Sequence, residues 1–380
     1  DRLRLTISAQ TSDAAALAQS ALEARARGER VLVVCADPAD VPRLAQEMPW
    51  FEPKLAVRPL PDWETLPYDV LSPQEELVSE RLEALYRLTA PTGGADVLLT
   101  SAVTASQRLS PVSYIGANTF FFHQGEQISL TTLQKRLAAA GYANVKQVLA
   151  AGEFAVRGSI VDVFPMGSER PFRLDFFDDE IESIRWFDVD TQRSMESAEE
   201  IRLLPGHEFP VDPEALLAFR QRWRREFAGD PKKSIVYCDI EKEILPPGIE
   251  YYLPLFFDET AALTDYLPPN ARVFLLGDIE AALQAFGRDM ASRYKVLAAD
   301  PQRPALAPER IWLKPEEFFK SLANFARFTV EKKENAEDLK RLTGIEVDRK
   351  SQNPVGKLLE RTRESAMKGV RTLIAAPSAG

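Results

Sequence analysis

The feature that most constrains the fold is a pair of short apolar runs separated by amphipathic segments. RVLVVCA (30–36) and ADVLLTSAV (95–103) lack a strict alternation of apolar and polar residues, so strands formed from them are buried on both faces. Segments with helical periodicity occupy 12–28, 37–48 and 71–88. Buried strands that alternate with helices are typical of a mostly parallel sheet covered on both sides, so the sequence predicts an α/β fold.

The helix expected over 71–88 has a recognisable start signal. Ser72 fits the N-cap, Pro73 the first helical position and Glu75 the third. In such a capping box the serine hydroxyl accepts from a backbone N–H, and the glutamate bonds back to the N-cap. We therefore expect this helix to begin at Pro73.

The first strand–helix turn, ISAQTSDAAAL (7–17), is the place where such a sheet often binds nucleotide phosphates. A P-loop needs G-x-x-x-x-G-K-[ST], because glycine backbones close around phosphate and the lysine meets the outer oxygens. The turn has no glycine and no lysine, and Asp13 stands where a phosphate would bind. It is either an ordinary turn or part of an ATPase fold that has lost ATP. Both interpretations predict no ATP hydrolysis and no cofactor.

Length and composition limit the remaining classes. The 380 residues suggest two or three domains at about 100–200 residues each. The net charge of −10 argues against a protein that mainly coats nucleic acid. Two cysteines and two histidines predict no disulfide framework and no His- or Cys-based metal site, and they favour a cytoplasmic location. The chain starts without Met and stops after VRTLIAAP, which suggests a piece of a longer protein.

Residues 120–205 have a different pattern, which predicts a small α+β domain. A short helix at 130–141 is followed by closely spaced strand-like runs, and short connections favour antiparallel pairing. The runs are VKQVLA, EFAVRG, SIVDVFP, PFRLDFF and EIESIRWFD.

The run PFRLDFFDDE (171–180) raises a specific question. In a strand, Phe172, Leu174 and Phe176 would point to one face, and Arg173, Asp175 and Phe177 to the other. The second face pairs an aromatic ring with charged groups, so another part of this chain or another protein is expected to cover it.

The charges around this strand leave both answers open. Between Gly152 and Met195 there are ten acidic residues and five basic ones, all arginine, a residue enriched at protein interfaces. Alternatively, the arginines form a solvated lattice with local carboxylates, and Phe177 folds beneath the loop 164–171. A metal site or a catalytic carboxylate pair is less favoured, because the acidic residues lack the spacing of a calcium loop and no cleft can be argued from the sequence.

Three long blocks resemble the N-terminal region of the bacterial transcription-repair coupling factor family. They are LPDWETLPYD (60–69) with the helix that follows, GEFAVRG…DTQRS (152–194) and PPGIEYYLPLFF (246–257). That region is in turn similar to the repair protein UvrB. The resemblance implies a degenerate helicase-like (P-loop-type) domain, discontinuous in sequence, with a small inserted domain that binds UvrA. It also implies that the P-loop and UvrB's DNA-clamping hairpin are missing.

The resemblance carries over to particular residues. The family's UvrA-contacting arginines and phenylalanine match Arg157, Arg173 and Phe177. Arg170, Asp175 and Glu180 are further candidates, expected at the rim of the UvrA contact.

The expected division has five parts. They are a first α/β segment (1–115), the inserted domain (120–205), a second α/β segment (206–330), a linker (331–354) and the truncated start of a further domain (355–380). The second segment should contain helices over 212–227 and 278–294 and strands SIVYC (234–238) and RVFLLG (272–277). RQRWRREF (220–227) is either a DNA contact or an exposed helix face with arginine stems over Trp223.

The sequence and the resemblance together predict a UvrA-recruiting, protein-binding module that links stalled transcription to nucleotide excision repair. The ATP-driven DNA translocase, the RNA polymerase contact and the duplex DNA contact would lie in later domains. The alternatives are an ATP-dependent DNA-binding or helicase-type module and a simple DNA-binding module.

Overall fold

The computed structural model describes residues 2–8, 12–90, 94–333 and 353–372. These residues fall into two units, 1–7 with 12–332, and 8–11 with 333–380, and each unit is described by itself. No described helix has the length and apolarity that a membrane span requires.

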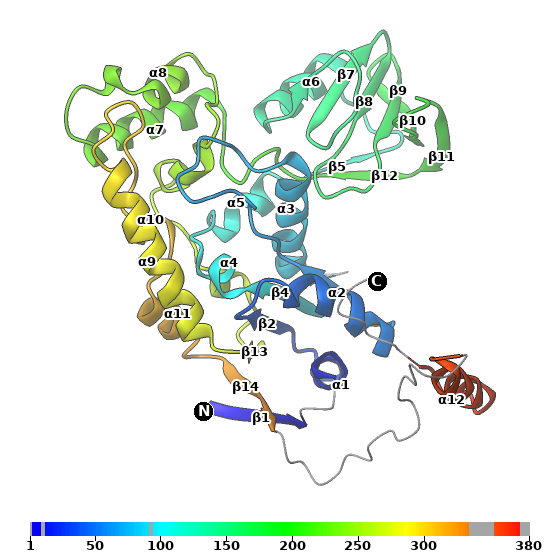
Figure 1. Cartoon of the computed structure of the whole chain (residues 1–380). Coiled ribbons are helices and arrows are strands. Elements are labelled where there is room, and N and C mark those ends of the chain that lie inside the picture. The colour runs from blue at the N-terminus through cyan, green and yellow to red at the C-terminus, as the bar shows by residue number, and fades with distance from the viewer. Residues whose placement is uncertain (1, 9–11, 91–93, 334–352, 373–380) are drawn as a thin grey trace. The chain divides into compact units, whose positions relative to one another are not determined.

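One part of the first unit is built around a six-stranded sheet (Figure 1). Its neighbouring strands are β1 (Arg2–Ser8), β14 (Ala326–Lys333), β13 (Arg272–Leu276), β2 (Val31–Cys35), β4 (Val97–Ser101) and β3 (Val57–Pro59). The pairs β14–β13, β13–β2, β2–β4 and β4–β3 are all parallel. Every residue of β2 and β4 is buried, as the unbroken apolar runs predict. The predicted α/β class is confirmed.

Helices cover both faces of this sheet. Alternate residues of β2 enter two separate cores: Val31 and Val33 pack with α1 (Asp13–Ala26) and α2 (Asp40–Phe51), whereas Leu32 packs with α3 (Glu75–Thr89). Further helices of the unit are α4 (Ala102–Ser106), α5 (Val112–Ala117), α9 (Ile279–Leu297), α10 (Pro308–Ile311) and α11 (Pro315–Ser321).

A second six-stranded sheet is built from the middle of the chain. Its order is β11 (Ser194–Ala198), β10 (Glu180–Phe187), β9 (Phe172–Phe177), β8 (Ile160–Val163), β7 (Glu153–Arg157) and β6 (Ala143–Asn144). Adjacent strands from β7 to β11 are antiparallel, as the short connections predict. Helix α6 (Leu130–Ala139) shares a core with one face of this sheet, and β5 (Phe120–His123) pairs with β12 (Glu200–Leu203).

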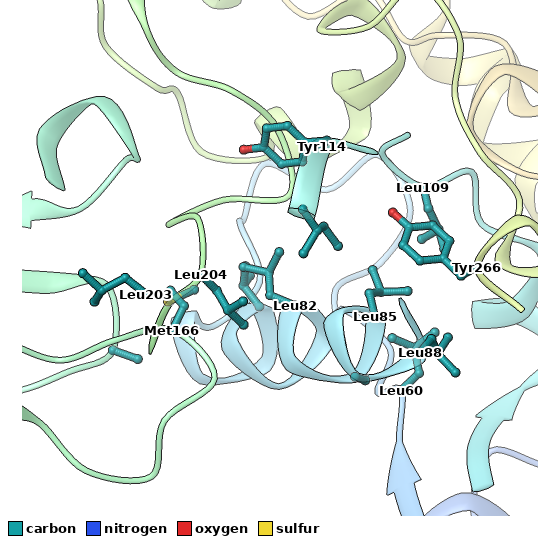
Figure 2. Close-up of a cluster of buried hydrophobic side chains, with 14 of the residues drawn as sticks. Leu60, Leu82, Leu85, Leu88, Leu109, Tyr114, Met166, Leu203, Leu204 and Tyr266 are labelled. Carbon is teal, nitrogen blue, oxygen red and sulfur yellow. The ribbon is translucent and has the colours of Figure 1, made fainter. Parts of the chain in front are cut away.

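Helix α3 ties the second sheet to the rest of the unit. Its apolar side chains meet Met166, Leu203 and Leu204, which belong to the second-sheet region (Figure 2). A fully buried ion pair lies nearby, where Arg81 Nε is 2.5 Å from Glu208 Oε1. The hydrophobic core is therefore continuous between α3 and the second-sheet region.

The remaining part of the first unit is an aromatic core. It is formed by α7 (Pro213–Glu226), α8 (Ile235–Glu241) and the 3-10 helix η2 (Ile249–Leu255), with side chains from neighbouring elements. The 3-10 helix η1 (Pro231–Lys233) has no buried residue, and η3 (Leu263–Tyr266) contributes Leu263 and Tyr266 to the core that contains α3. In the second unit, α12 (Gly356–Met367) is the helix predicted after residue 355, and none of its side chains is buried. The predicted linker (331–354) and final strand lie mostly outside the described residues.

Three local predictions are wrong. SIVYC forms the start of α8, because Ser234 caps a helix whose Val236, Tyr237 and Ile240 all enter the aromatic core. VKQVLA (145–150) forms no strand beyond β6 and lies as a loop. The capping box at Ser72 does not form, because its hydroxyl bonds Glu250 Oε2 at 2.8 Å and α3 begins at Glu75.

Candidate partner-binding face on the second sheet

The two faces of the second sheet differ as the alternation along β9 predicts. Phe172, Leu174 and Phe176 are buried in the core that contains α6, and Arg173, Asp175 and Phe177 lie on the opposite side. Strand pairing adds neighbours to this second side. Asp162 is opposite Arg173, and Arg157 and Asp175 are both opposite Ile160. We call the surface formed by Arg157, Asp162, Arg173, Asp175 and Phe177 the Arg/Phe face.

A buried carboxylate organises this face. Asp162 has no solvent exposure and accepts hydrogen bonds from two arginines. Arg173 donates through Nε at 2.6 Å and through a terminal nitrogen at 2.9 Å, and Arg157 donates through one terminal nitrogen. Charge-assisted bonds of this kind fix a guanidinium in position, so both arginines are held in place before a partner arrives.

Arg173 is held most firmly. Its guanidinium also donates to Gln192 O at 3.1 Å and to Ser194 Oγ at 3.2 Å, and it lies 4.9 Å from the centre of the Phe187 ring. The hydrogen bonds to Asp162 are the main reason that the pKa of Arg173 is raised. The side chain of Arg173 is only 15% exposed, so less of it reaches the surface than of Arg157.

Part of the second side is covered by this chain. Phe187 and Ala155 pack with Val148 from the loop at 145–150, and Gln192 Nε2 donates to Val148 O at 3.4 Å. The loop predicted as a strand therefore covers the half of the sheet around Phe187.

The other half is open. Phe177 is 67% exposed and the Arg157 side chain 49% exposed. Both lie at the sheet end that carries two tight turns, Gly158–Ser159 and Asp178–Asp179, and Gly158 has φ +62°. The interpretation that Phe177 folds beneath the loop 164–171 is wrong. The arginines do pair with a local carboxylate, but that carboxylate is buried instead of solvated.

The rim residues take different places. Asp175 lies on the face itself, between Ile160 and Ser183 in the sheet. Glu180 is opposite Phe177 and accepts from Gln127 Nε2 at 2.8 Å. Arg170 lies 5.8 Å from the Trp186 ring, which stacks on Phe172 on the other side of the sheet.

Asp162 is the residue that sequence reasoning missed. It appeared in the sequence as one carboxylate among ten. A signal for it did exist, because a two-residue turn after Arg157 places Ala155 opposite Asp162, and the next hairpin brings Arg173 beside it.

The first turn of α1 carries its own negative charge. Asp13 is buried, and both its carboxylate oxygens accept from Arg43, at 2.8 and 2.9 Å. Ser12 caps the helix by accepting from Ala15 N. A carboxylate already occupies the helix N-terminus that a phosphate would need, so these residues do not fit the phosphates of a nucleoside triphosphate. Within the described parts of the chain, no cluster of three or more His, Cys, Asp or Glu residues could hold a metal ion.

The arginines of α7 are mostly engaged within the protein. Arg222 is 2.6 Å from Asp258, Arg220 is 3.8 Å from Glu241, and Arg224 lies 5.5 Å from the Tyr237 ring. Trp223 is buried among aromatic rings of the core, including Tyr252. The ion pairs of its arginines and the burial of its tryptophan therefore give this helix a structural explanation.

Comparisons with known proteins point to one family. A family model described as "UvrB interaction domain" matches residues 120–209. The chain is 42% identical over 298 residues to the transcription-repair-coupling factor of Escherichia coli (strain K12), covering 78% of this chain and 26% of the relative. It is 44% identical over 272 residues to the transcription-repair-coupling factor of Haemophilus influenzae, and this match covers 71% of this chain and 23% of the relative. For the Bacillus subtilis protein the values are 32% over 216 residues, covering 53% and 18%. The chain spans about a quarter of the length of the first two relatives.

Proposed function

Because the chain is similar to the N-terminal region of the transcription-repair-coupling factors, we propose that it is a protein-binding module that recruits UvrA. The Arg/Phe face is the proposed contact. One observation carries the proposal: an exposed Phe177 lies on the same side of the sheet as two arginines that a buried carboxylate holds in position.

The physical basis is that of an interface hot spot. Aromatic rings and arginines dominate binding energies when a partner excludes water from them. Phe177 loses its unfavourable contact with water on binding, and Arg157 offers donors without first losing much side-chain freedom. The covered half of the sheet keeps the face rigid, so little ordering is required.

The wider assignments rest on the resemblance. We propose that the parallel-sheet part is a degenerate helicase-like domain, discontinuous in sequence, with residues 120–205 inserted into it. DNA translocation, contact with RNA polymerase and contact with duplex DNA would belong to the remaining length of the longer relatives. In the full protein the module would connect stalled transcription to excision repair.

The alternative is an ATP-dependent DNA-binding or helicase-type module. The Asp13–Arg43 ion pair at the start of α1 argues against it. The two proposals differ in a thermal-shift titration with ATP and magnesium, where the protein-binding module should show no change. A saturable rise in melting temperature that substitution of Asp13 changes would favour the alternative.

The direct test is calorimetric titration of the chain with purified UvrA. Phe177→Ala and Arg157→Ala remove exposed side chains, so both variants should fold normally and bind at least about tenfold more weakly. Arg136→Ala on α6 is the matched control, because it removes an exposed arginine from the helix that packs against the other side of the sheet. Equal binding by all four proteins would place the contact elsewhere.

A further inference from the structure

Arg185 extends the row of charges across the second sheet. On β10 it is directly opposite Arg173, and on its other side it is opposite Ser197 of β11. Directly opposed residues of antiparallel strands share a side of the sheet, so Arg185 lies beside the Arg/Phe face. It is exposed, and it has no ion-pair partner among the residues that the structure describes.

Without a bound partner, the direct pairing of Arg185 with Arg173 lowers the stability of the folded protein. Like charges that are directly opposite destabilise an antiparallel pair. Arg173 avoids part of the repulsion by turning to Asp162 on β8, but no described carboxylate plays that part for Arg185. Arg157 and Arg173 share the buried carboxylate of Asp162, so Arg185 adds a third guanidinium to this side of the sheet without an ion-pair partner of its own among the described residues.

We propose that Arg185 is a further partner-binding residue, which binds a single carboxylate side chain on the partner protein. The inference rests on the proposed function and adds a residue and a charge requirement to the same face. A guanidinium offers paired N–H donors that match a carboxylate, and this geometry is available because the side chain is not engaged elsewhere.

The surroundings favour a protein carboxylate over a nucleic acid. The turn that follows Phe177 reads DDE (178–180), and Glu182 comes two residues later, both on the exposed rim of the face. These acidic groups would repel a continuous phosphate backbone, whereas a single carboxylate side chain can reach Arg185 without approaching them.

The test combines binding and stability. The whole chain is titrated with UvrA at low and at physiological salt, as wild type, Arg185→Gln, Phe177→Ala and the control Arg136→Gln. We expect Arg185→Gln to weaken binding by about tenfold at low salt and by less at physiological salt. Its melting temperature should equal or exceed that of the wild type, because the variant removes repulsion from Arg173. Arg136→Gln should change neither quantity.

The other outcomes overturn the inference in distinguishable ways. If Phe177→Ala loses binding and Arg185→Gln does not, the proposed function stands and the role of Arg185 is wrong. If Arg185→Gln lowers binding and melting temperature together, its role is structural. If the wild type does not bind UvrA, the proposed function and this inference are both wrong.

Discussion

Removing the carboxylate of Asp162 should destabilise the second sheet far more than removing Arg157. In Asp162→Ala the guanidinium of Arg173, only 15% exposed, keeps two neutral acceptors, Gln192 O and Ser194 Oγ, and loses its anion. Breaking a buried pair in this way costs roughly 3–5 kcal/mol, and the remaining acceptors put the value near the lower end, about 3 kcal/mol. Arg157→Ala leaves Asp162 with both bonds from Arg173, so about 1 kcal/mol or less is expected.

Amide hydrogen exchange measures this difference locally. A loss of about 3 kcal/mol corresponds to roughly 100-fold faster exchange in peptides from β8 and β9. Peptides from β2, in the other sheet, are the internal control and should be unchanged. Arg173→Ala should resemble Asp162→Ala, because it leaves the buried carboxylate with a single partner. This is the reason to test UvrA binding with Arg157 and Phe177 rather than with Arg173.

Two results would refute the reasoning. Equal exchange rates in Asp162→Ala and Arg157→Ala would mean that the two hydrogen bonds from Arg173 to Asp162 add no measurable stability. A loss below about 1 kcal/mol in Asp162→Ala would mean that water reaches the carboxylate in solution, as in the solvated lattice.

Three further predictions concern groups away from the face. Burial raises the pKa of Glu250 to about 7 from 4.5, so ionisation of this carboxyl lowers the stability of the folded protein as pH rises from about 4.5 through 7. In urea unfolding, Glu250→Gln should be more stable than wild type by about 3 kcal/mol at pH 8 but not at pH 4.5. Burial lowers the pKa of His207 to about 4 from 6.5, so the neutral imidazole stabilises the folded protein, and this stabilisation is lost as pH falls from 6.5 to 4. An NMR titration should show the imidazole neutral down to about pH 4. Gly141 has φ +91° and a Cβ there would lie 2.8 Å from His207, so Gly141→Ala should lower the free energy of unfolding by about 1–3 kcal/mol. The control Gly116→Ala on α5, with open space around it, should be neutral or stabilising by about 0.5 kcal/mol in thermal unfolding.

The sequence predicted structure well where local pattern and burial agree. The unbroken apolar runs gave the parallel strands β2 and β4, and the alternation along β9 placed Phe177 on the charged side. In both cases one periodicity decides the outcome, because each side chain must enter a core or face away from it.

Prediction failed where a distant partner decided the outcome. Ser72 had the correct spacing for a cap, but Glu250, far along the chain, takes its hydroxyl. SIVYC contains β-branched and apolar residues that would suit a strand, yet it forms a helix, because its apolar side chains pack in the aromatic core at helical spacing. The alternation within one strand does not distinguish Asp162 from other acidic residues, because its role depends on the register with the strands beside β8, which only the hairpin turns indicate.

The contact between α3 and the second-sheet region limits which fragments of the protein can fold when they are expressed alone. The matched family model covers 120–209, which suggests that this stretch could be produced alone. Such a fragment would contain Met166, Leu203 and Leu204 without the leucines of α3 that cover them, and Glu208 without Arg81. It would therefore expose an apolar patch, which promotes aggregation during expression, and Glu208 would lose the ion pair that fixes it in the folded protein. A soluble minimal binder should keep α3 joined to the second sheet, or replace those apolar residues with polar ones.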